Sequence, residues 1–339
     1  MGQPGDVAPV GVDQILKGRQ AHAGHNGGTV PDVRAGVRGR VPAFPAVTVP
    51  GARPRVIAHR GASHDLPEHT PAAYRRALEV GADGLECDVR LSADGHLVCV
   101  HDARVDRTSS GRGPVSGMRL DQLRSLDWGS WMPDGARSGS AGDSAYGDSD
   151  EGGGDLEPGR RELLSLRELF VLARDCGRPV ELAVETKHPN RFGARVEEAL
   201  VDLLTEFGWQ HGGSGVGSGE GAGAAAAAGV RVRMMSFSAL AVRRMHRLAP
   251  WLELVYLMER VPRVYRDGSL PPGAAVAGLD VAHLRTAPDL VDRLHRAGRR
   301  VHVWTVDDPV DVELCLASQV EAIITNRPRE VLAQVRAAR

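Results

Sequence analysis

Residues 55–91 read RVIAHRGASHDLPEHTPAAYRRALEVGADGLECDVRL. The apolar segments 55–59 and 84–90 within this stretch are short, are followed by turn-forming residues and are typical of buried strands. The segment 70–80 between them is predicted to be a helix. This order predicts two parallel strands of one sheet, joined by a helix.

Local signals mark where the predicted helices begin and end. Thr70 suits an N-cap, Pro71 suits the first helical position and Gly81 suits the position after the last turn. Further along the chain, residues 165–168 read SLRE. This is a capping box, which marks the start of a second helix.

The alternation of strand and helix continues to the end of the chain. Predicted strands lie at 55–59, 84–90, 180–186, 231–237, 253–258, 276–282, 300–306 and 322–325. Predicted helices lie at 70–80, 165–176, 190–207, 238–247, 286–297, 309–317 and 328–338. The weakest helix signal follows the fifth strand. Eight strands in this order predict an α/β fold, the (β/α)8 TIM barrel.

Some regions lie outside this pattern. We expect residues 1–50 to form an irregular N-terminal extension and residues 51–339 to form the barrel. Gly-rich stretches near 133–160 and 212–229 are predicted to be flexible inserts. The first follows the second strand, on the face where barrel active sites lie, whereas the second precedes a strand and belongs to the opposite face.

Composition limits the classes of function. The 339 residues are 42% hydrophobic and 25% charged, and the formal net charge is −1. We therefore expect no nucleic-acid partner and no stable membrane insertion. The N-terminus shows no secretory signal and the four cysteines show no CxxC spacing, which favours a cytoplasmic protein with free thiols. The oligomeric state stays open.

Acidic residues and histidines gather where the first two predicted strands end. His59 and Arg60 follow the first strand. Glu86 and Asp88 lie on one face of the second strand, about 6.6 Å apart along the backbone. Carboxylates in this arrangement can bind one cation at oxygen–metal distances of about 2.0–2.6 Å.

A turn follows the second strand. Residues 92–95 read SADG and lie between two apolar segments, which predicts a β-hairpin. A turn centred near Ala93 and Asp94 places His101 opposite Glu86. The hairpin therefore returns this histidine to the acidic pair.

The third strand adds charged residues to the same rim. Glu185 and Lys187 are two apart, so they lie on one face, and Glu185 supplies a third carboxylate. An all-oxygen set suits Mg²⁺ or Ca²⁺ better than zinc. Two histidines beside a cation suit general acid–base catalysis at phosphorus, and Arg60 and Lys187 suit the binding of phosphoryl oxygens.

These motifs, in this order, resemble the glycerophosphodiester phosphodiesterase family, whose members are phospholipase-C-like barrels. The matching motifs are HRG at 59–61, PExT at 67–70, ExD at 86–88, HD at 101–102, DRT at 106–108, GRG at 111–113, ETK at 185–187, SF at 236–237, WTVD at 304–307 and TNRP at 325–328. The resemblance covers roughly residues 55–335 as one barrel.

The resemblance implies metal-dependent hydrolysis of a small-molecule glycerophosphodiester to glycerol 3-phosphate and an alcohol. It implies His59 and His101 as the acid/base pair. It also implies one divalent cation, Mg²⁺ or Ca²⁺, on Glu86, Asp88 and Glu185.

The resemblance also suggests which residues meet the substrate. Arg60 and Lys187 would contact the phosphate, and Glu68 would lie next to the substrate or the metal. Trp304 would either pack against the glycerol moiety or cover the barrel core. The sequence departs from the family at His69, where the family usually has Asn.

Three other functions stay open. The same barrel could act on lysophospholipids, as a lysophospholipase D does, but an aromatic content of 4% gives this no support. It could bind phosphodiesters or a protein without catalysis, although the intact histidines and carboxylates argue against this. A sugar isomerase-like metal barrel would not explain Arg60 next to His59.

Overall fold

The computed structural model describes residues 53–133, 157–210 and 229–338. The predicted extension over residues 1–50 and most of the two predicted inserts lie outside these ranges. The division of the chain at residue 51 stays a prediction. Across the described ranges, no helix is both long and apolar enough to cross a membrane.

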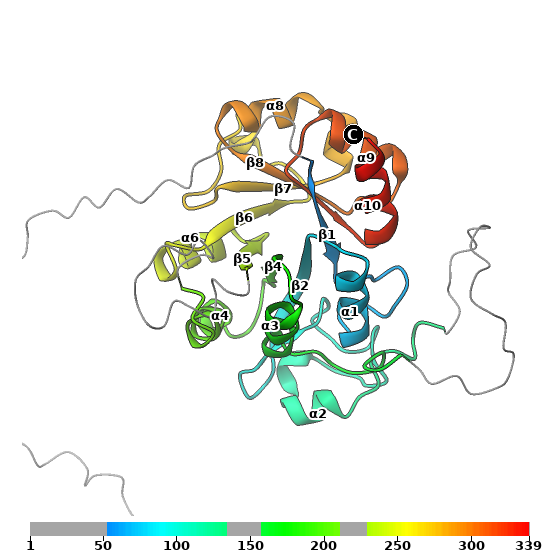
Figure 1. The fold of residues 1–339 in the computed structure, drawn as a ribbon. Helices are drawn as coiled ribbons and strands as arrows, with labels where there is room; N and C mark the ends of the chain where they lie inside the picture. The colour runs from blue at the N-terminus through cyan, green and yellow to red at the C-terminus, as the bar shows by residue number, and fades with distance from the viewer. Residues whose placement is uncertain (1–52, 134–156, 211–228, 339) are drawn as a thin grey trace, which may run out of the picture. The chain divides into compact units, whose positions relative to one another are not determined.

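Eight parallel strands form a closed barrel, which confirms the predicted fold (Figure 1). They are β1 (Arg55–His59), β2 (Gly84–Leu91), β4 (Val180–Thr186), β5 (Val230–Ser236), β6 (Glu253–Met258), β7 (Val276–Asp280), β8 (Arg300–Trp304) and β9 (Ala322–Thr325). The barrel closes because β1 pairs with both β2 and β9. A further strand, β3 (Leu97–Cys99), runs antiparallel to β2 and forms the predicted hairpin.

Helices follow the strands and surround the barrel (Figure 1). The α-helices are α1 (Pro71–Glu79), α2 (Leu120–Arg124), α3 (Leu166–Asp175), α4 (Arg195–Glu206), α6 (Ala239–Leu248), α7 (Ala282–Thr286), α8 (Asp289–Arg296), α9 (Pro309–Ala317) and α10 (Pro328–Ala337). Two 3-10 helices are η1 (Val115–Gly117) and η2 (Arg263–Tyr265). The predicted caps are confirmed, because Thr70 and Ser165 each accept a hydrogen bond from the backbone three residues later.

Two helix predictions differ from the structure. The helix predicted at 286–297 is α8, which begins only at Asp289, because Pro288 disfavours a helical conformation at the residue before it, and the short α7 before it was not predicted. The helix predicted at 190–207 begins only at Arg195. Gly193, just before it, has a positive φ of 60°, which a right-handed helix does not contain.

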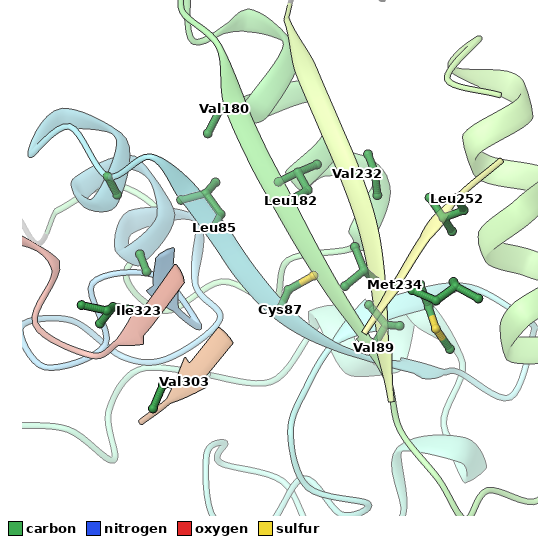
Figure 2. Packing of buried hydrophobic residues seen from close by; sticks show 14 of the residues in the cluster. Leu85, Cys87, Val89, Val180, Leu182, Val232, Met234, Leu252, Val303 and Ile323 are labelled. Carbon is green, nitrogen blue, oxygen red and sulfur yellow. The ribbon is translucent and has the colours of Figure 1, made fainter. Parts of the chain in front are cut away.

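Side chains of the strands alternate between the helices and the barrel interior. The outward side chains form one large apolar cluster with the helices. Figure 2 shows members of this cluster on β2, β4 and β5, among them Cys87, Leu182 and Met234. Inward apolar side chains form a separate cluster of Ile57, Ala183, Met235, Val255, Leu257, Val276, Ala322 and Ile324. Charged residues at positions of the same parity lie nearer the strand ends, among them Glu181 at one end of β4 and Glu185 at the other.

The hairpin has a different register from the predicted one. Val89 lies opposite Cys99, so the same ladder, if continued, would put His101 opposite Cys87 rather than Glu86. The prediction is wrong by one residue because the turn is centred on Asp94. His101 nevertheless lies at the barrel mouth, where Arg90 donates to its carbonyl oxygen from Nη2 at 2.7 Å.

Candidate active site

The C-terminal ends of the strands surround a pocket, which we call the catalytic mouth. It is lined by His59, Arg60, Glu86, His101, Glu185, Lys187, Met235, Phe237, Leu257, Trp304, Thr305 and Ile324. Most of the residues predicted from the sequence are therefore in one place. The other two predicted residues, Asp88 and Glu68, contact Arg60 directly.

The three predicted metal ligands are close together. One carboxylate oxygen from each of Glu86, Asp88 and Glu185 lies within 4.8 Å of the others, and all three residues are buried. Asp88 of β2 is the register partner of Glu185 of β4. Parallel pairing therefore brings together carboxylates that lie far apart in the sequence.

Basic side chains partly neutralise this acidic cluster. Lys187 Nζ lies 2.9 Å from Asp88 Oδ1 and 2.8 Å from Glu185 Oε1. Arg60 Nε lies 3.1 Å from Asp88 Oδ2. Burial and the charge of Asp88 nevertheless raise the pKa of Glu86 well above its usual range and the pKa of Glu185 to about 8. These raised pKa values favour protonated carboxyls when no cation is bound, and a divalent cation would stabilise the ionised forms instead.

His59 is held in a defined orientation. Its Nδ1 lies 2.7 Å from Oδ1 of Asn326, whose Nδ2 donates to Asp307 at 2.6 Å. An amide oxygen only accepts, so His59 Nδ1 carries a proton and Nε2 is left for another partner. Burial, followed by the charge of Arg60, lowers the pKa of His59 to about 4. The imidazole is therefore neutral at pH 7 and can accept a proton.

His101 is held in the same way by a different group. Its Nδ1 lies 2.7 Å from Oδ1 of Asp102. The carboxylate fixes the tautomer with the proton on Nδ1, and Nε2 is again left for a partner in the pocket. Burial lowers the pKa of His101, while the hydrogen bond with Asp102 opposes that shift.

Arg60 lies on a tight turn after β1. Its backbone N–H donates to Glu86 Oε2 at 3.0 Å, and its Nη1 donates to Glu68 Oε1 at 3.1 Å. Gly61 follows with a φ of 87°, and a Cβ at that position would lie 2.7 Å from the carbonyl carbon of Ala73. The HRG motif therefore needs glycine for its conformation and for space.

His69, the departure from the family pattern, is buried under the acidic cluster. Its Nε2 lies 3.0 Å from Asp88 Oδ2, and its Nδ1 lies 2.8 Å from the hydroxyl of Tyr74. Its φ of 63° is in the left-handed region, which Asn and His tolerate better than most residues. The imidazole therefore helps to hold a predicted metal ligand.

One wall of the catalytic mouth is apolar. Trp304 at the end of β8 and Phe237 after β5 pack edge to face, with ring centroids 5.4 Å apart. Phe237 is 40% exposed and lines the pocket. Both predicted roles of Trp304, packing against glycerol and covering the barrel core, fit this position, and the contact with glycerol stays a prediction.

Sequence reasoning gave no role to three residues that hold the site together. Asn326 and Asp307 orient His59, and Arg107 contacts Asp102. All three lie in the motifs TNRP, WTVD and DRT. The motifs could have marked these residues as members of the site. Their contacts depend on the conformation of loops, which the strand and helix pattern does not predict.

Comparison with known proteins agrees with this geometry. The chain matches the Glycerophosphoryl diester phosphodiesterase family over residues 59–330. The chain belongs to this family. It is 43% identical over 276 residues to a Mycobacterium tuberculosis protein named "Probable glycerophosphodiester phosphodiesterase 1", covering 81% of this chain and 90% of that protein. It is 29% identical to a glycerophosphodiester phosphodiesterase of Caldanaerobacter subterraneus, covering 83% of this chain and 97% of that protein.

Solved structures of family members share the fold. A phosphodiesterase of Oleispira antarctica, solved in complex with the product sn-glycerol-3-phosphate, matches with a TM-score of 0.63 and 20% identity. The match covers 84% of this chain and 97% of the Oleispira chain. The glycerophosphodiester phosphodiesterase of Agrobacterium tumefaciens matches with a TM-score of 0.59 and 23% identity, covering 83% of this chain and 99% of that chain.

Proposed function

We propose that this member of the family hydrolyses glycerophosphodiesters to glycerol 3-phosphate and an alcohol. One observation carries the proposal. Two histidines, each fixed through Nδ1, share a pocket with two basic side chains and with Glu86 and Glu185, which cluster with Asp88. The product found in the Oleispira antarctica phosphodiesterase supports the same substrate class.

Three carboxylates would hold one divalent cation, Mg²⁺ or Ca²⁺. Glu86, Asp88 and Glu185 fit this ion because they offer buried oxygen ligands within 4.8 Å of one another. When bound, the cation would polarise a phosphoryl oxygen as a Lewis acid.

The remaining residues of the site supply charge and proton transfer. Arg60 and Lys187 would bind the phosphoryl oxygens and neutralise charge that develops on them. One histidine Nε2 would accept the proton of the attacking hydroxyl, which belongs to water or to the glycerol moiety. The Nε2 of the other would donate a proton to the leaving alkoxide.

The apolar wall supports a small organic moiety beside the phosphate. We infer that the face of Trp304 packs against the glycerol carbons, supported by Phe237. Neither family membership nor the site favours the lysophospholipase alternative. A location in the cytoplasm and the lack of a nucleic-acid partner stay predictions from composition.

A panel assay tests this function. Glycerophosphocholine, glycerophosphoethanolamine, lysophosphatidylcholine and a chromogenic phosphodiester are each offered with Mg²⁺, Ca²⁺ or EDTA. We expect hydrolysis of the glycerophosphodiesters, loss of turnover in EDTA and recovery with one of the cations. Turnover that survives EDTA would exclude the metal. No turnover of any phosphodiester would favour a binding protein.

A pair of histidine variants tests the acid/base assignment. We expect His101→Ala to lower turnover about 10²–10⁴-fold, as removal of a general acid or base does. His96 lies in the turn of the same hairpin with 57% of its side chain exposed, so His96→Ala is the matched control and should keep full turnover. Full turnover in His101→Ala would exclude the assignment.

A further inference from the structure

Arg107 bridges two carboxylates at the edge of the catalytic mouth. It lies on the segment after β3, and its Nη1 and Nη2 donate to Glu68 Oε2 and Oε1 at 2.9 and 2.7 Å. Its Nε and Nη2 donate to Asp102 Oδ2 and Oδ1 at 2.8 and 3.2 Å. A planar guanidinium has enough donors to bind both carboxylates at once.

Each of these carboxylates contacts a residue of the proposed chemistry. Glu68 accepts a hydrogen bond from Arg60 Nη1 at 3.1 Å. Asp102 Oδ1 lies 2.7 Å from His101 Nδ1. A continuous chain of charged contacts therefore joins Arg60 to His101, and Arg107 is its centre.

We propose that Arg107 is a positioning residue that fixes His101 and Arg60 relative to each other. Through Asp102 it holds the His101 tautomer that presents Nε2 to the pocket. Through Glu68 it holds the Arg60 guanidinium in place for the phosphate. The proposal rests on the function proposed above and adds a residue to it.

The local environment favours this role over that of an ordinary surface ion pair. Arg107 has 44% of its side chain exposed, whereas Glu68 has 12% and Asp102 has 30%, so the guanidinium joins two less exposed carboxylates that each contact a residue of the site. Hydrogen bonds from Arg107 lower the pKa of Asp102 to about 2, against the effect of partial burial. Asp102 therefore stays ionised and accepts from His101 across the neutral pH range.

Substitutions of Arg107 test the proposal in the full-length enzyme with glycerophosphocholine as the probe. We expect Arg107→Gln to lower kcat per folded molecule about 10–100-fold and to raise KM. Arg107→Lys should not restore kcat, because an ammonium group lacks the guanidinium fork. Arg104→Gln is the matched control on the same segment, since Arg104 is 59% exposed and pairs with Asp106. This control should keep wild-type kcat.

A double-mutant cycle separates positioning from a general structural role. If Arg107 acts on kcat through Asp102, the kcat effect of Arg107→Gln should fall to about twofold or less in an Asp102→Asn background. A full, additive effect in that background would overturn the proposal. So would wild-type kcat in Arg107→Gln.

A measurement that needs no turnover distinguishes failure of this proposal from failure of the proposed function. Histidine ring nitrogens are followed by ¹⁵N NMR in the wild type, Arg107→Gln and Arg104→Gln. We expect one His101 tautomer, protonated on Nδ1, in the wild type and the control, and a mixture in Arg107→Gln. If the wild type hydrolyses no phosphodiester, the proposed function fails. The His101 tautomer in Arg107→Gln then still tests whether Arg107 is a positioning residue. An unchanged His101 tautomer in Arg107→Gln would overturn the positioning role.

Discussion

The two ends of the barrel interior both bury charged groups, but they differ in how these charges are balanced. At the N-terminal end of the strands, Arg233 lies between Glu181 at 2.5 Å and Glu253 at 3.4 Å. Arg300 also pairs with Glu253, and Arg233 Nη1 donates to His302 Nε2 at 2.9 Å. At the C-terminal end, three clustered carboxylates share two basic side chains, and two of these carboxylates, Glu86 and Glu185, line a pocket.

The pKa shifts at the two ends express this difference. Burial would raise the pKa of Glu253, but Arg233 and Arg300 bring it below its usual value. The pKa values of Glu86 and Glu185 at the other end stay raised. Removing one partner from a neutralised buried cluster is destabilising, whereas carboxyls with perturbed pKa values beside a pocket are candidates for binding a cation and a substrate. Barrel enzymes generally show the same division between a structural and a catalytic end.

The largest expected effect comes from the histidine at the catalytic end. His59→Gln should lower kcat for a glycerophosphodiester about 10²–10⁴-fold, because Nε2 is lost as a proton-transfer group. The free energy of unfolding should change by about 1 kcal/mol or less. Steady-state kinetics and urea unfolding check both values. A variant that lost stability but kept kcat per folded molecule would contradict the division between the ends.

The next effect concerns the opposite end. Arg233→Met leaves Glu181 and Glu253 buried without their shared partner and should lower the free energy of unfolding by about 3 kcal/mol. Turnover per folded molecule should not change. Arg231 is the matched control, because its side chain is 55% exposed and 4.0 Å from Glu181. Arg231→Gln should shift the unfolding free energy by about 0.5 kcal/mol or less in urea denaturation. Equal losses of unfolding free energy in Arg233→Met and Arg231→Gln would contradict the role of the buried cluster in stability.

The smallest effect is a difference in acid stability. Burial and the charges of Arg233 and Arg300 lower the pKa of His302 well below its usual value. The unfolded chain therefore binds a proton below about pH 6.5 that the folded chain does not, so stability falls as pH drops towards the folded pKa. Between pH 7 and pH 5, the free energy of unfolding of His302→Gln should fall by about 1–2 kcal/mol less than that of the wild type. Urea unfolding at the two pH values checks this, and parallel losses would contradict it.

Much of the fold could be predicted because it depends on local patterns. Thr70 and Ser165 cap their helices through contacts within three residues, and alternation on β2 separates Glu86 and Asp88 from Cys87. The hairpin register was missed by one residue, since it depends on where the turn is centred. The start of α8 was predicted three residues too early although Pro288 is visible in the sequence.

The candidate site was predictable in its members but not in its contacts. The residues of the catalytic mouth follow strand ends, and parallel strands bring those ends together. Long-range pairs such as His59 with Asn326 and Arg107 with Glu68 depend on how loops fold over the mouth. No periodicity in the sequence encodes those pairs.

The sequence by itself determined the barrel, its strand ends and the chemical types of groups that gather there. Hydrophobic alternation is enough for this, because it sets which face of each strand is buried. The tertiary structure decided which charges are neutralised. Glu181 and Glu185 lie on the same face of β4. Arg233 pairs with Glu181 and balances its charge, whereas the pKa of Glu185 stays raised beside Asp88. That difference arises from neighbours on other strands, because electrostatic balance depends on distances in space and not on spacing along the chain.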